Sequence, residues 1–359
     1  MSQMAEMTCV LCLGDHKVEV ATTAIEHPGP GEIRVRTMAS AICGSDLHHY
    51  RTSQRVRSER GWSQYAIGHE SSGIVDAVGP GVQYPSEGDR VVVFGLLGCG
   101  HCNLCRRGEP MFCKEARHFS RHQHGTDAAY LVAPARNALL LPDDFSFEMG
   151  VLLSCNVGTA YGALRKAKPS GDRILGVFGL GPVGLACVLL GKAHGASVVG
   201  IDPSADRRNL ALHLGGDAAV DSAASDLIEQ LEAFSGGDGL HATIDTSGQP
   251  SARGAAIDAL RVHGTCIEVG VGHDPSIAPS EQILFKEITI QGSWLYKQYE
   301  WEGLVEFVRR HHIPIENLIT HRFQPEDAAE AFELANTATS GKIIFDWSQA
   351  CLEGRLLDG

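Results

Sequence analysis

The spacing of hydrophobic and polar residues changes near residue 170 of the chain. Before that point, short apolar runs are separated by Gly-Pro, Pro-Gly and Gly-Asp pairs, which favour turns. Apolar runs of this length between turn residues predict β-strands rather than helices. We therefore expect a mainly β region with loops, with strands over residues 17–21, 32–38, 73–78 and 90–94.

Beyond residue 170, apolar strands and helices are predicted to alternate. Two further helices, over residues 301–310 and 325–337, precede a last strand over 342–346. Alternating elements of this length are typical of a parallel, doubly wound sheet, so the fold class is α/β. The alternating strands are expected over 173–178, 197–201, 242–245 and 264–269, and their helices over 182–194, 205–214 and 250–260.

One apolar segment approaches the length of a membrane span. Residues 174–191 carry no charge over eighteen positions. The segment also contains five glycines and Pro182, which indicate a strand, a tight turn and a helix of a buried parallel unit. We therefore expect no association with a membrane.

Length and charge limit the possible function classes. At 359 residues the chain exceeds the size at which one hydrophobic core stops growing, so two domains are expected. The formal net charge is −13, from 30 basic and 43 acidic residues. A protein that binds a nucleic-acid duplex needs a basic face that displaces counterions. We therefore expect no nucleic-acid partner.

Cysteine usage indicates the compartment. The chain has eleven cysteines, an odd number, and no basic-then-apolar signal peptide at its start. This combination favours metal ligands over disulfides and predicts a cytoplasmic protein.

Four of these cysteines lie in one short polar stretch with the spacing C-x2-C-x2-C-x7-C. Thiolates this close in sequence can form a tetrahedral shell around Zn2+. A shell of four thiolates leaves no open position for a substrate, so we interpret this site as structural. Its predicted ligands are Cys99, Cys102, Cys105 and Cys113.

A glycine motif follows the first strand of the second region. Gly179, Gly181 and Gly184 form G-x-G-x-x-G before a helix whose N-terminus can hold a pyrophosphate. Asp202 ends the next predicted strand, where it can accept hydrogen bonds from the adenosine ribose and repel a 2'-phosphate. Arg207 is near enough to pair with such a phosphate, but it follows an intact acid. The motif therefore favours NAD over NADP as the cofactor.

Three separated positions indicate a second metal site. Cys43, His69 and Cys155 are thiolate, imidazole and thiolate donors, and three protein ligands leave a fourth position open, as catalytic zinc requires. Each position alone is more often a packed core residue. Their joint occurrence with the four-cysteine loop and the glycine motif favours a catalytic zinc site.

With these motifs, the chain resembles the zinc-containing medium-chain dehydrogenase/reductase family, which includes alcohol, sorbitol-type polyol and threonine dehydrogenases. The resemblance covers nearly the whole length. It implies a Rossmann NAD-binding domain over residues 157–294. It also implies a mainly β, GroES-like catalytic domain over 1–156 and 295–359, with a structural zinc lobe over 95–115.

The resemblance also implies roles for single residues near the catalytic zinc. Glu70 corresponds to the family's acid behind the metal, which can enter the zinc shell. Asp46 corresponds to the carboxylate that orients the histidine ligand, His69. Ser45 and His48 match the family's proton relay, in which an imidazole that titrates near neutral pH takes the proton. Besides the residues named above, we expect the cofactor to contact Pro182, Val183, Val269, Val271 and Ser293.

Two departures leave the substrate branch open. At the position of Cys155, polyol and threonine dehydrogenases typically have glutamate, whereas alcohol dehydrogenases have cysteine, as this chain does. Gly44 stands where many animal and plant alcohol dehydrogenases carry an arginine, which favours the polyol and threonine branch instead.

We expect a homodimer or homotetramer with two zinc ions per chain that transfers a hydride reversibly between a secondary alcohol or polyol and NAD. The alternatives are a primary alcohol, an aldehyde, a hydroxy amino acid or a cyclitol as substrate. A cofactor-binding protein without catalysis is the alternative outside enzymes, and the intact Ser45, Cys43 and His69 argue against it.

Overall fold

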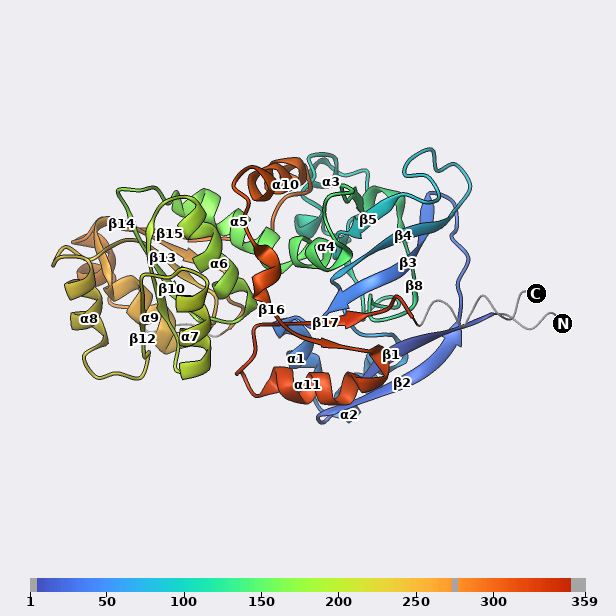
Figure 1. Cartoon of the computed structure of the whole chain (residues 1–359), viewed down its shortest axis with the longest axis horizontal. Coiled ribbons are helices and arrows are strands. Elements are labelled where there is room, and N and C mark those ends of the chain that lie inside the picture. Colours follow the sequence, from blue (N-terminus) through green and yellow to red (C-terminus); the bar gives the residue numbers. More distant parts are fainter. Residues whose placement is uncertain (1–4, 273–276, 350–359) are drawn as a thin grey trace.

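Two separate β-sheets organise the chain in this computed structural model, which describes residues 5–272 and 277–349 (Figure 1). A seven-stranded sheet contains strands from the first 140 residues and from the C-terminal part, and a six-stranded sheet contains the strands between residues 174 and 292. The predicted α/β fold with a second, mainly β domain is confirmed. No helix of the described residues is long and apolar enough to cross a membrane.

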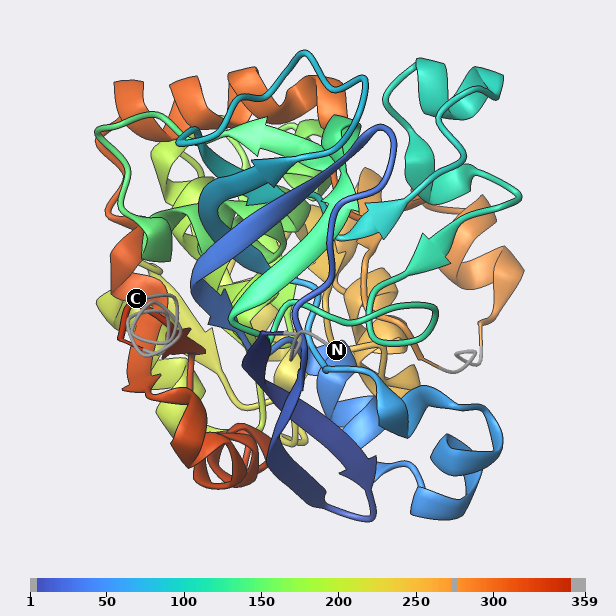
Figure 2. The ribbon, with the colours of Figure 1, turned by 90° about the vertical axis from the view of Figure 1, so that its right-hand side faces the viewer.

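The seven-stranded sheet runs in the order β16-β17-β3-β4-β5-β9, and β8 also pairs with β3. Its central strand β3 alternates buried and half-buried residues, as expected for a sheet with two unequal faces. The β1–β2 hairpin lies beside the sheet (dark blue in Figure 2). β6 and β7 form another two-stranded sheet. The strands of this part of the chain are β1 Glu6–Gly14, β2 Lys17–Ala24, β3 Glu32–Ala41, β4 Ser71–Val78, β5 Arg90–Val93, β6 Leu96–Leu97, β7 Arg117–His118, β8 Tyr130–Pro134, β9 Ala138–Leu140, β16 Ile319–Phe323 and β17 Lys342–Asp346.

Seven helices belong to this part of the chain or join it to the other sheet. Five of them, α1, α2, α3, α4 and α5, were not predicted from the sequence. In α5, ten of twelve residues are buried, so the helix lacks the one-sided apolar pattern by which helices are recognised. The helices are α1 Gly44–Arg51, α2 Gln54–Glu59, α3 Asn103–Arg106, α4 Phe147–Ser154, α5 Asn156–Ala167, α10 Trp301–Arg310 and α11 Ala328–Asn336.

The six-stranded sheet is parallel throughout, in the order β12-β11-β10-β13-β14-β15. This is the strand order of a Rossmann fold, in which ligands bind where the order reverses, here between β10 and β13. The strands are β10 Ile174–Phe178, β11 Ser197–Ile201, β12 Ala218–Val220, β13 Leu240–Asp245, β14 Leu260–Glu268 and β15 Thr289–Gly292. The helices are α6 Pro182–Ala193, α7 Ala205–His213, α8 Leu227–Phe234 and α9 Pro250–Asp258.

Two aspects of the sequence prediction for this region were wrong. The strand expected from residue 264 begins at Leu260, where the preceding helix was expected to continue. The strands β12 and β15 and the helix α8 were not predicted. β12 has three residues and β15 is exposed along its length, so neither carries the apolar run that indicates a buried strand.

One apolar core joins the two sheets. It continues from the seven-stranded sheet through α4 and α5 to α6, and includes Val92, Leu152, Val157 and Leu185. The α4–α5 junction is therefore held rigidly between the sheets.

Candidate active site

The first candidate zinc ligand, Cys43, immediately precedes α1. Its backbone N–H donates to Asp46 Oδ2 at 2.9 Å, which satisfies a free donor at the helix start. The other carboxylate oxygen, Asp46 Oδ1, lies 3.3 Å from His69 Nδ1. One buried carboxylate therefore positions both the helix start and the imidazole ring.

His69 and Glu70 come from the turn before β4. Gly68 has a φ of +94°, and a Cβ there would lie 2.5 Å from Asp127 Oδ1, so glycine is required. Cys155 is buried in the short break between α4 and α5. Segments far apart in sequence thus meet at one place.

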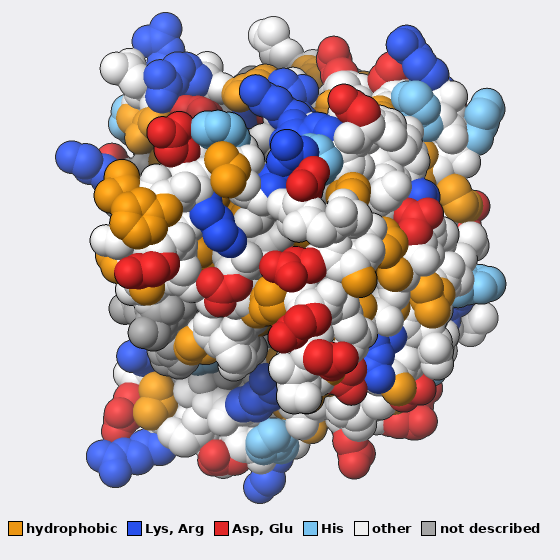
Figure 3. All heavy atoms as spheres, turned by 90° about the vertical axis from the view of Figure 1, so that its left-hand side faces the viewer, with side chains coloured by type: hydrophobic (Ala, Val, Ile, Leu, Met, Phe, Trp, Pro, Cys, Tyr) orange, Lys and Arg blue, Asp and Glu red, His pale blue; other side chains and the backbone are white. Residues whose placement is uncertain are grey.

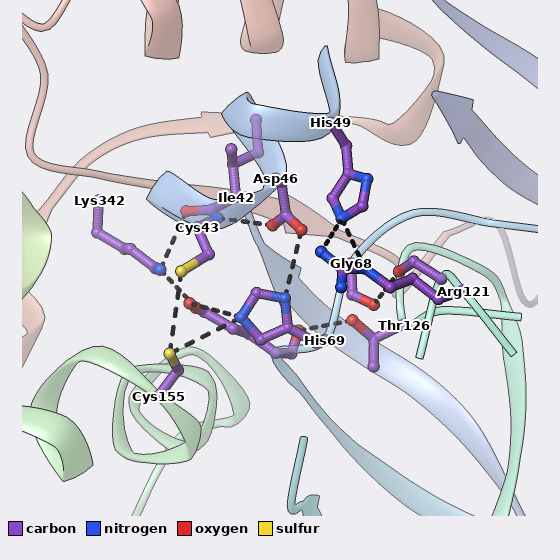
Figure 4. A network of polar contacts seen from close by, with 12 residues as sticks. Ile42, Cys43, Asp46, His49, Gly68, His69, Arg121, Thr126, Cys155 and Lys342 are labelled. Atoms are coloured by element: carbon purple, nitrogen blue, oxygen red, sulfur yellow. Dashed lines mark hydrogen bonds and ion pairs between the residues drawn. The ribbon is translucent and has the colours of Figure 1, made fainter. Parts of the chain in front are cut away.

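The donor atoms of these residues converge (Figure 4). Cys155 Sγ lies 4.0 Å from Cys43 Sγ and 3.9 Å from His69 Nε2. With an oxygen of Glu70, these atoms all lie within 4.8 Å of one another. Two sulfurs bound at about 2.3 Å to one tetrahedral zinc would lie about 3.8 Å apart, close to the separation found here. The donor set could therefore hold a zinc ion.

The two thiols and the imidazole of this site shift one another's pKa values. The hydrogen bond with Cys155 lowers the pKa of Cys43 well below its usual value, and the same bond raises the pKa of Cys155. Burial opposes the charged form of His69, but the charges of Asp46 and Cys43 raise its pKa above the usual value. The thiolate favoured at Cys43 is the form of cysteine that binds metals.

Lys342, which the sequence analysis did not identify, forms an ion pair with Glu70. Both side chains are fully buried, and Lys342 Nζ contacts Glu70 Oε2 and donates to Ile42 O at 3.0 Å. Burial raises the pKa of Glu70 to about 7, although the charge of Lys342 acts in the opposite direction. A strand lysine normally reaches solvent, so its sequence position gave no signal of this role.

Ser45 and His48 lie on α1, within five residues of Cys43. Both are exposed, and neither side chain makes a hydrogen bond to another described residue. The two residues predicted as a proton relay are thus on the same short helix but are not bonded to each other.

The four-cysteine loop forms a second cluster. Cys99 and Cys105 sulfurs are 3.9 Å apart, as are those of Cys102 and Cys113, and all four lie within 4.8 Å of one another. The backbone N–H groups of His101 and Cys102 lower the pKa of Cys99 to about 6. Amide hydrogen bonds to sulfur favour thiolates, so this loop could hold a second zinc.

The loop packs on the segment that precedes α10. Gln298 N–H donates to Gly108 O at 2.9 Å. Lys297 Nζ lies 4.3 Å from the centre of the Phe112 ring, which also contacts Trp294. The loop (upper right in Figure 2) therefore supports the chain where it returns from the six-stranded sheet.

The glycine motif forms the turn between β10 and α6. Gly179 has a φ of +88°, and a Cβ on Gly184 would lie 1.9 Å from Gly179 O. Gly181 precedes α6, and Pro182 takes its first position, where the missing N–H costs no hydrogen bond. Val183 follows in the same turn. The N–H groups of this helix start can bind an anion.

Asp202 follows β11 directly and is 4% exposed. Its Oδ2 accepts the Leu180 N–H at 2.7 Å, and its Oδ1 accepts the Ser204 N–H at 2.8 Å. Each carboxylate oxygen can accept a second hydrogen bond, so the group can still receive ribose hydroxyls.

The two neighbouring arginines differ. Arg208 donates to the carbonyl oxygens of Asp202 and Pro203 and pairs with Asp221. Arg207 Nε is buried without a hydrogen-bond partner among the described residues. Arg207 therefore keeps a buried donor for a ligand, whereas the Nη1 group of Arg208 is already engaged.

The other expected cofactor contacts lie after β14 and β15. Val269 N–H donates to Asp245 O, Val271 is 94% exposed, and Ser293 is buried with an unpartnered Oγ within the described residues. They are at the carboxyl ends of the parallel strands, as is the glycine turn.

Protein-family models match both parts of the chain. The alcohol dehydrogenase GroES-like domain matches residues 29–143, and the zinc-binding dehydrogenase domain matches residues 182–310. The first range includes the four-cysteine loop, and the second begins within the glycine turn.

Known relatives match over nearly the full length. The uncharacterized zinc-type alcohol dehydrogenase-like protein YphC of Escherichia coli (strain K12) is 30% identical, covering 96% of this chain and 99% of that protein. L-threonine 3-dehydrogenase of Pyrococcus furiosus is 30% identical and covers 92% and 95%. L-idonate 5-dehydrogenase of Vitis vinifera is 31% identical and covers 93% of each chain.

A solved structure shares the fold. The alcohol dehydrogenase RspB from E. coli CFT073, in complex with NADH, superposes with a TM-score of 0.84 at 28% identity, covering 95% of this chain and 99% of that one. Together with the two domain matches and the full-length relatives, this shows that the chain belongs to the zinc-type alcohol dehydrogenase family of oxidoreductases.

Proposed function

We propose that the protein oxidises a secondary alcohol or polyol reversibly, with zinc at the reacting oxygen and NAD as hydride acceptor. The observation that carries this proposal is the convergence of Cys43 Sγ, His69 Nε2 and Cys155 Sγ within 4.8 Å of one another. Their thiolate and imidazole chemistry suits zinc, and three ligands leave one position open for a substrate.

In this proposal, Cys43, His69 and Cys155 hold the metal, and Glu70 is a fourth donor within reach. When bound, the zinc supplies a Lewis acid for the alcohol oxygen, and the NAD supplies the hydride acceptor. Asp46 keeps the His69 ring in the orientation that directs Nε2 toward the site.

Ser45 and His48 are assigned to proton transfer. Ser45 is two positions from Cys43, and its hydroxyl would relay the alcohol proton by accepting it while passing its own proton on toward the exposed His48, which can release it to solvent. Because the two side chains are not bonded to each other, the path requires a bridging group between them.

NAD is assigned to the turn at the carboxyl edge of the parallel sheet. The N–H groups at the start of α6 suit the pyrophosphate, and the carboxylate of Asp202 suits the ribose hydroxyls and disfavours a 2'-phosphate. We assign the remaining contacts to Gly179, Gly181, Pro182, Val183, Gly184, Arg207, Val269, Val271 and Ser293.

A secondary hydroxyl is favoured by the relatives. L-threonine 3-dehydrogenase and L-idonate 5-dehydrogenase are both named for carbons that carry secondary hydroxyls. Because Cys155 at the third metal position is typical of alcohol dehydrogenases, the identity of the alcohol has to be measured directly.

We also propose the domain organisation expected from the sequence. The catalytic domain comprises residues 1–156 and 295–359, the NAD domain comprises 157–294, and a structural zinc lobe spans 95–115. The cysteine geometry of the lobe and the position of the parallel sheet support these limits.

A homodimer or homotetramer fits the exposed sheet edge. β15 ends the six-stranded sheet and is exposed along its length, and such an edge is a template for pairing. Ile290 on this strand and the nearby Leu284 and Phe285 are exposed, and Figure 3 shows apolar side chains gathered at one side of this end of the molecule. We place the protein in the cytoplasm, because the ten described cysteines are all free thiols.

The function is tested by removing metal ligands one at a time. In Cys43→Ala and His69→Ala, NAD reduction on a panel of secondary alcohols and polyols should fall more than a thousandfold. Zinc content should fall from two ions per chain to one. The matched control is Cys187→Ala, a buried cysteine of α6 outside the site, which should keep both zinc and activity.

Full activity of either ligand variant after loss of one zinc would contradict the proposal. So would a wild-type enzyme with two zinc ions and no activity on any alcohol or on the corresponding carbonyl with NADH.

A further inference from the structure

Three arginines gather around Trp62 beside the proposed metal site. Arg57 donates to Trp62 O at 3.1 Å and is fully buried. The guanidinium carbons of Arg60 and Arg121 lie 4.6 Å and 4.9 Å from the centre of the Trp62 ring. We call Arg57, Arg60, Trp62 and Arg121 the arginine cluster.

No carboxylate of the described residues forms an ion pair with this cluster. Across residues 5–272 and 277–349, none of the three arginines has an ion pair with Asp or Glu within 4.0 Å. Arg55 of the same helix α2 does pair, with Glu59 at 2.8 Å. In a chain with a net charge of −13, an unbalanced arginine cluster is unusual.

His49 lies between two of these arginines and cannot accept hydrogen bonds from both. Its Nδ1 is 2.7 Å from Arg57 Nη1, and its Nε2 is 3.3 Å from Arg121 Nε and Nη2. Burial first, and then the two arginines, lower the pKa of His49 to about 3, so the ring is neutral. A neutral imidazole has one acceptor nitrogen, and the shorter contact gives it to Arg57. Arg121 contacts the other ring nitrogen through Nε and Nη2, and within the described residues its Nη1 makes no hydrogen bond.

Arg121 is next to the reacting centre. Ser120 Oγ donates to Gly68 O at 2.9 Å, so the segment with Arg121 packs on the turn that carries His69. Figure 4 shows His49 and Arg121 beside Gly68 and His69. Arg121 is half-buried rather than enclosed.

We propose that the arginine cluster binds an oxyanion of the substrate, a carboxylate or a phosphate monoester, through Arg121. A guanidinium group binds either oxyanion through paired N–H donors. Arg60 adds positive charge, and Trp62 supports both groups. The substrate would then be an alcohol with an acidic group at a distance from the oxidised carbon.

This inference concerns the class of substrate and rests on the proposed function, because the arginine cluster is placed relative to the proposed metal site. Cation–π contact of Arg60 and Arg121 with Trp62 attracts the guanidinium groups but does not occupy their N–H donors. An acidic protein also repels anionic substrates, so a local positive cluster is needed to bind one.

The test compares compounds with one carbon skeleton: a neutral polyol, its sugar acid and its terminal phosphate. The zinc-loaded enzyme is assayed with NAD, and binding of each compound is measured separately by calorimetry. In Arg121→Gln, the ratio of kcat/KM for the preferred anionic compound to that for the neutral one should fall about 10- to 100-fold, mainly through KM. Arg121→Lys should retain part of the preference, and the control Arg55→Gln should keep it.

The sugar-acid and phosphate arms identify which oxyanion is bound. An unchanged ratio in Arg121→Gln, or a wild-type enzyme that binds the neutral polyol as tightly as both anions, would overturn the inference. If the enzyme turned over neutral alcohols only, the inference would be overturned and the proposed function would stand. Calorimetric anion binding lost in Arg121→Gln, without turnover of any alcohol, would support the arginine site and contradict the proposed function.

Discussion

Burial and two neighbouring arginines keep His49 neutral in the folded chain, with its pKa lowered from 6.5 to about 3. In the unfolded chain the imidazole takes up a proton near pH 6.5. The unfolded state therefore binds more protons between pH 6.5 and 3, and stability rises with pH in this window. The contribution of His49 is complete above pH 6.5 and is lost progressively as the pH falls toward 3.

This linkage predicts a smaller acid sensitivity in His49→Gln. Between pH 6.5 and 5.5, the wild type should lose about 1 kcal/mol of unfolding free energy through this residue. Glutamine can still accept the Arg57 N–H but does not titrate. Urea unfolding of the zinc-loaded protein at pH 7.5, 6.5 and 5.5 measures the difference, and equal pH dependence in both proteins would show that His49 is not the cause.

Among the elements, the start of α6 and the turn before it leave little steric freedom. A Cβ at Gly184 would lie 1.9 Å from a carbonyl oxygen, whereas a Cβ at Gly254 of α9 would meet nothing within 4 Å. The two glycines are both helical and so form a matched pair.

We expect Gly184→Ala to weaken NADH binding more than tenfold, because the turn must open to admit the methyl group. Gly254→Ala should keep the affinity and stabilise its helix by up to about 1 kcal/mol. Titration of NADH fluorescence checks both. Equal NADH affinity in Gly184→Ala and the wild type would mean that the turn does not hold the cofactor.

The four-cysteine loop is a second element for which a substitution has a defined effect on zinc content and stability. In Cys102→Ser, one zinc per chain should be lost and the thermal unfolding midpoint should fall, because a structural zinc contributes directly to the folding of its loop. Metal analysis and calorimetry on the same sample measure both. Cys266→Ser, at a buried position outside both clusters, is the control and should keep two zinc ions. Unchanged zinc content in Cys102→Ser would exclude a structural site there.

At the scale of the whole molecule, we expect the exposed edge strand β15 to join the chains of a homodimer or homotetramer. The chain mass is 38.4 kDa, so light scattering should give about twice or four times this value. Ile290→Lys places a charge on the exposed edge strand and should shift the mass toward one chain. Leu212→Lys, at a similarly exposed apolar residue of α7, should leave it unchanged. A wild-type protein of single-chain mass would contradict the proposal.

The overall organisation was predictable because the responsible signals are local. The alternation of strands and helices predicted β10, α6, β11 and α7 to within two residues. The same reasoning missed α4 and α5, since a helix buried on all sides has no polar face to mark its period.

The sequence by itself determined the chemistry available to this protein: four closely spaced thiols, a glycine turn followed by an acid, and three separated metal donors. The first two signals depend on residue type and short spacing, and the three separated donors were recognised by residue type together with those motifs. Only the tertiary structure decided which distant groups meet. The pairing of Lys342 with Glu70, and the position of Arg121 against His49, depend on strands and loops packed from far along the chain. No local pattern carries such contacts, because packing and burial bring these groups together.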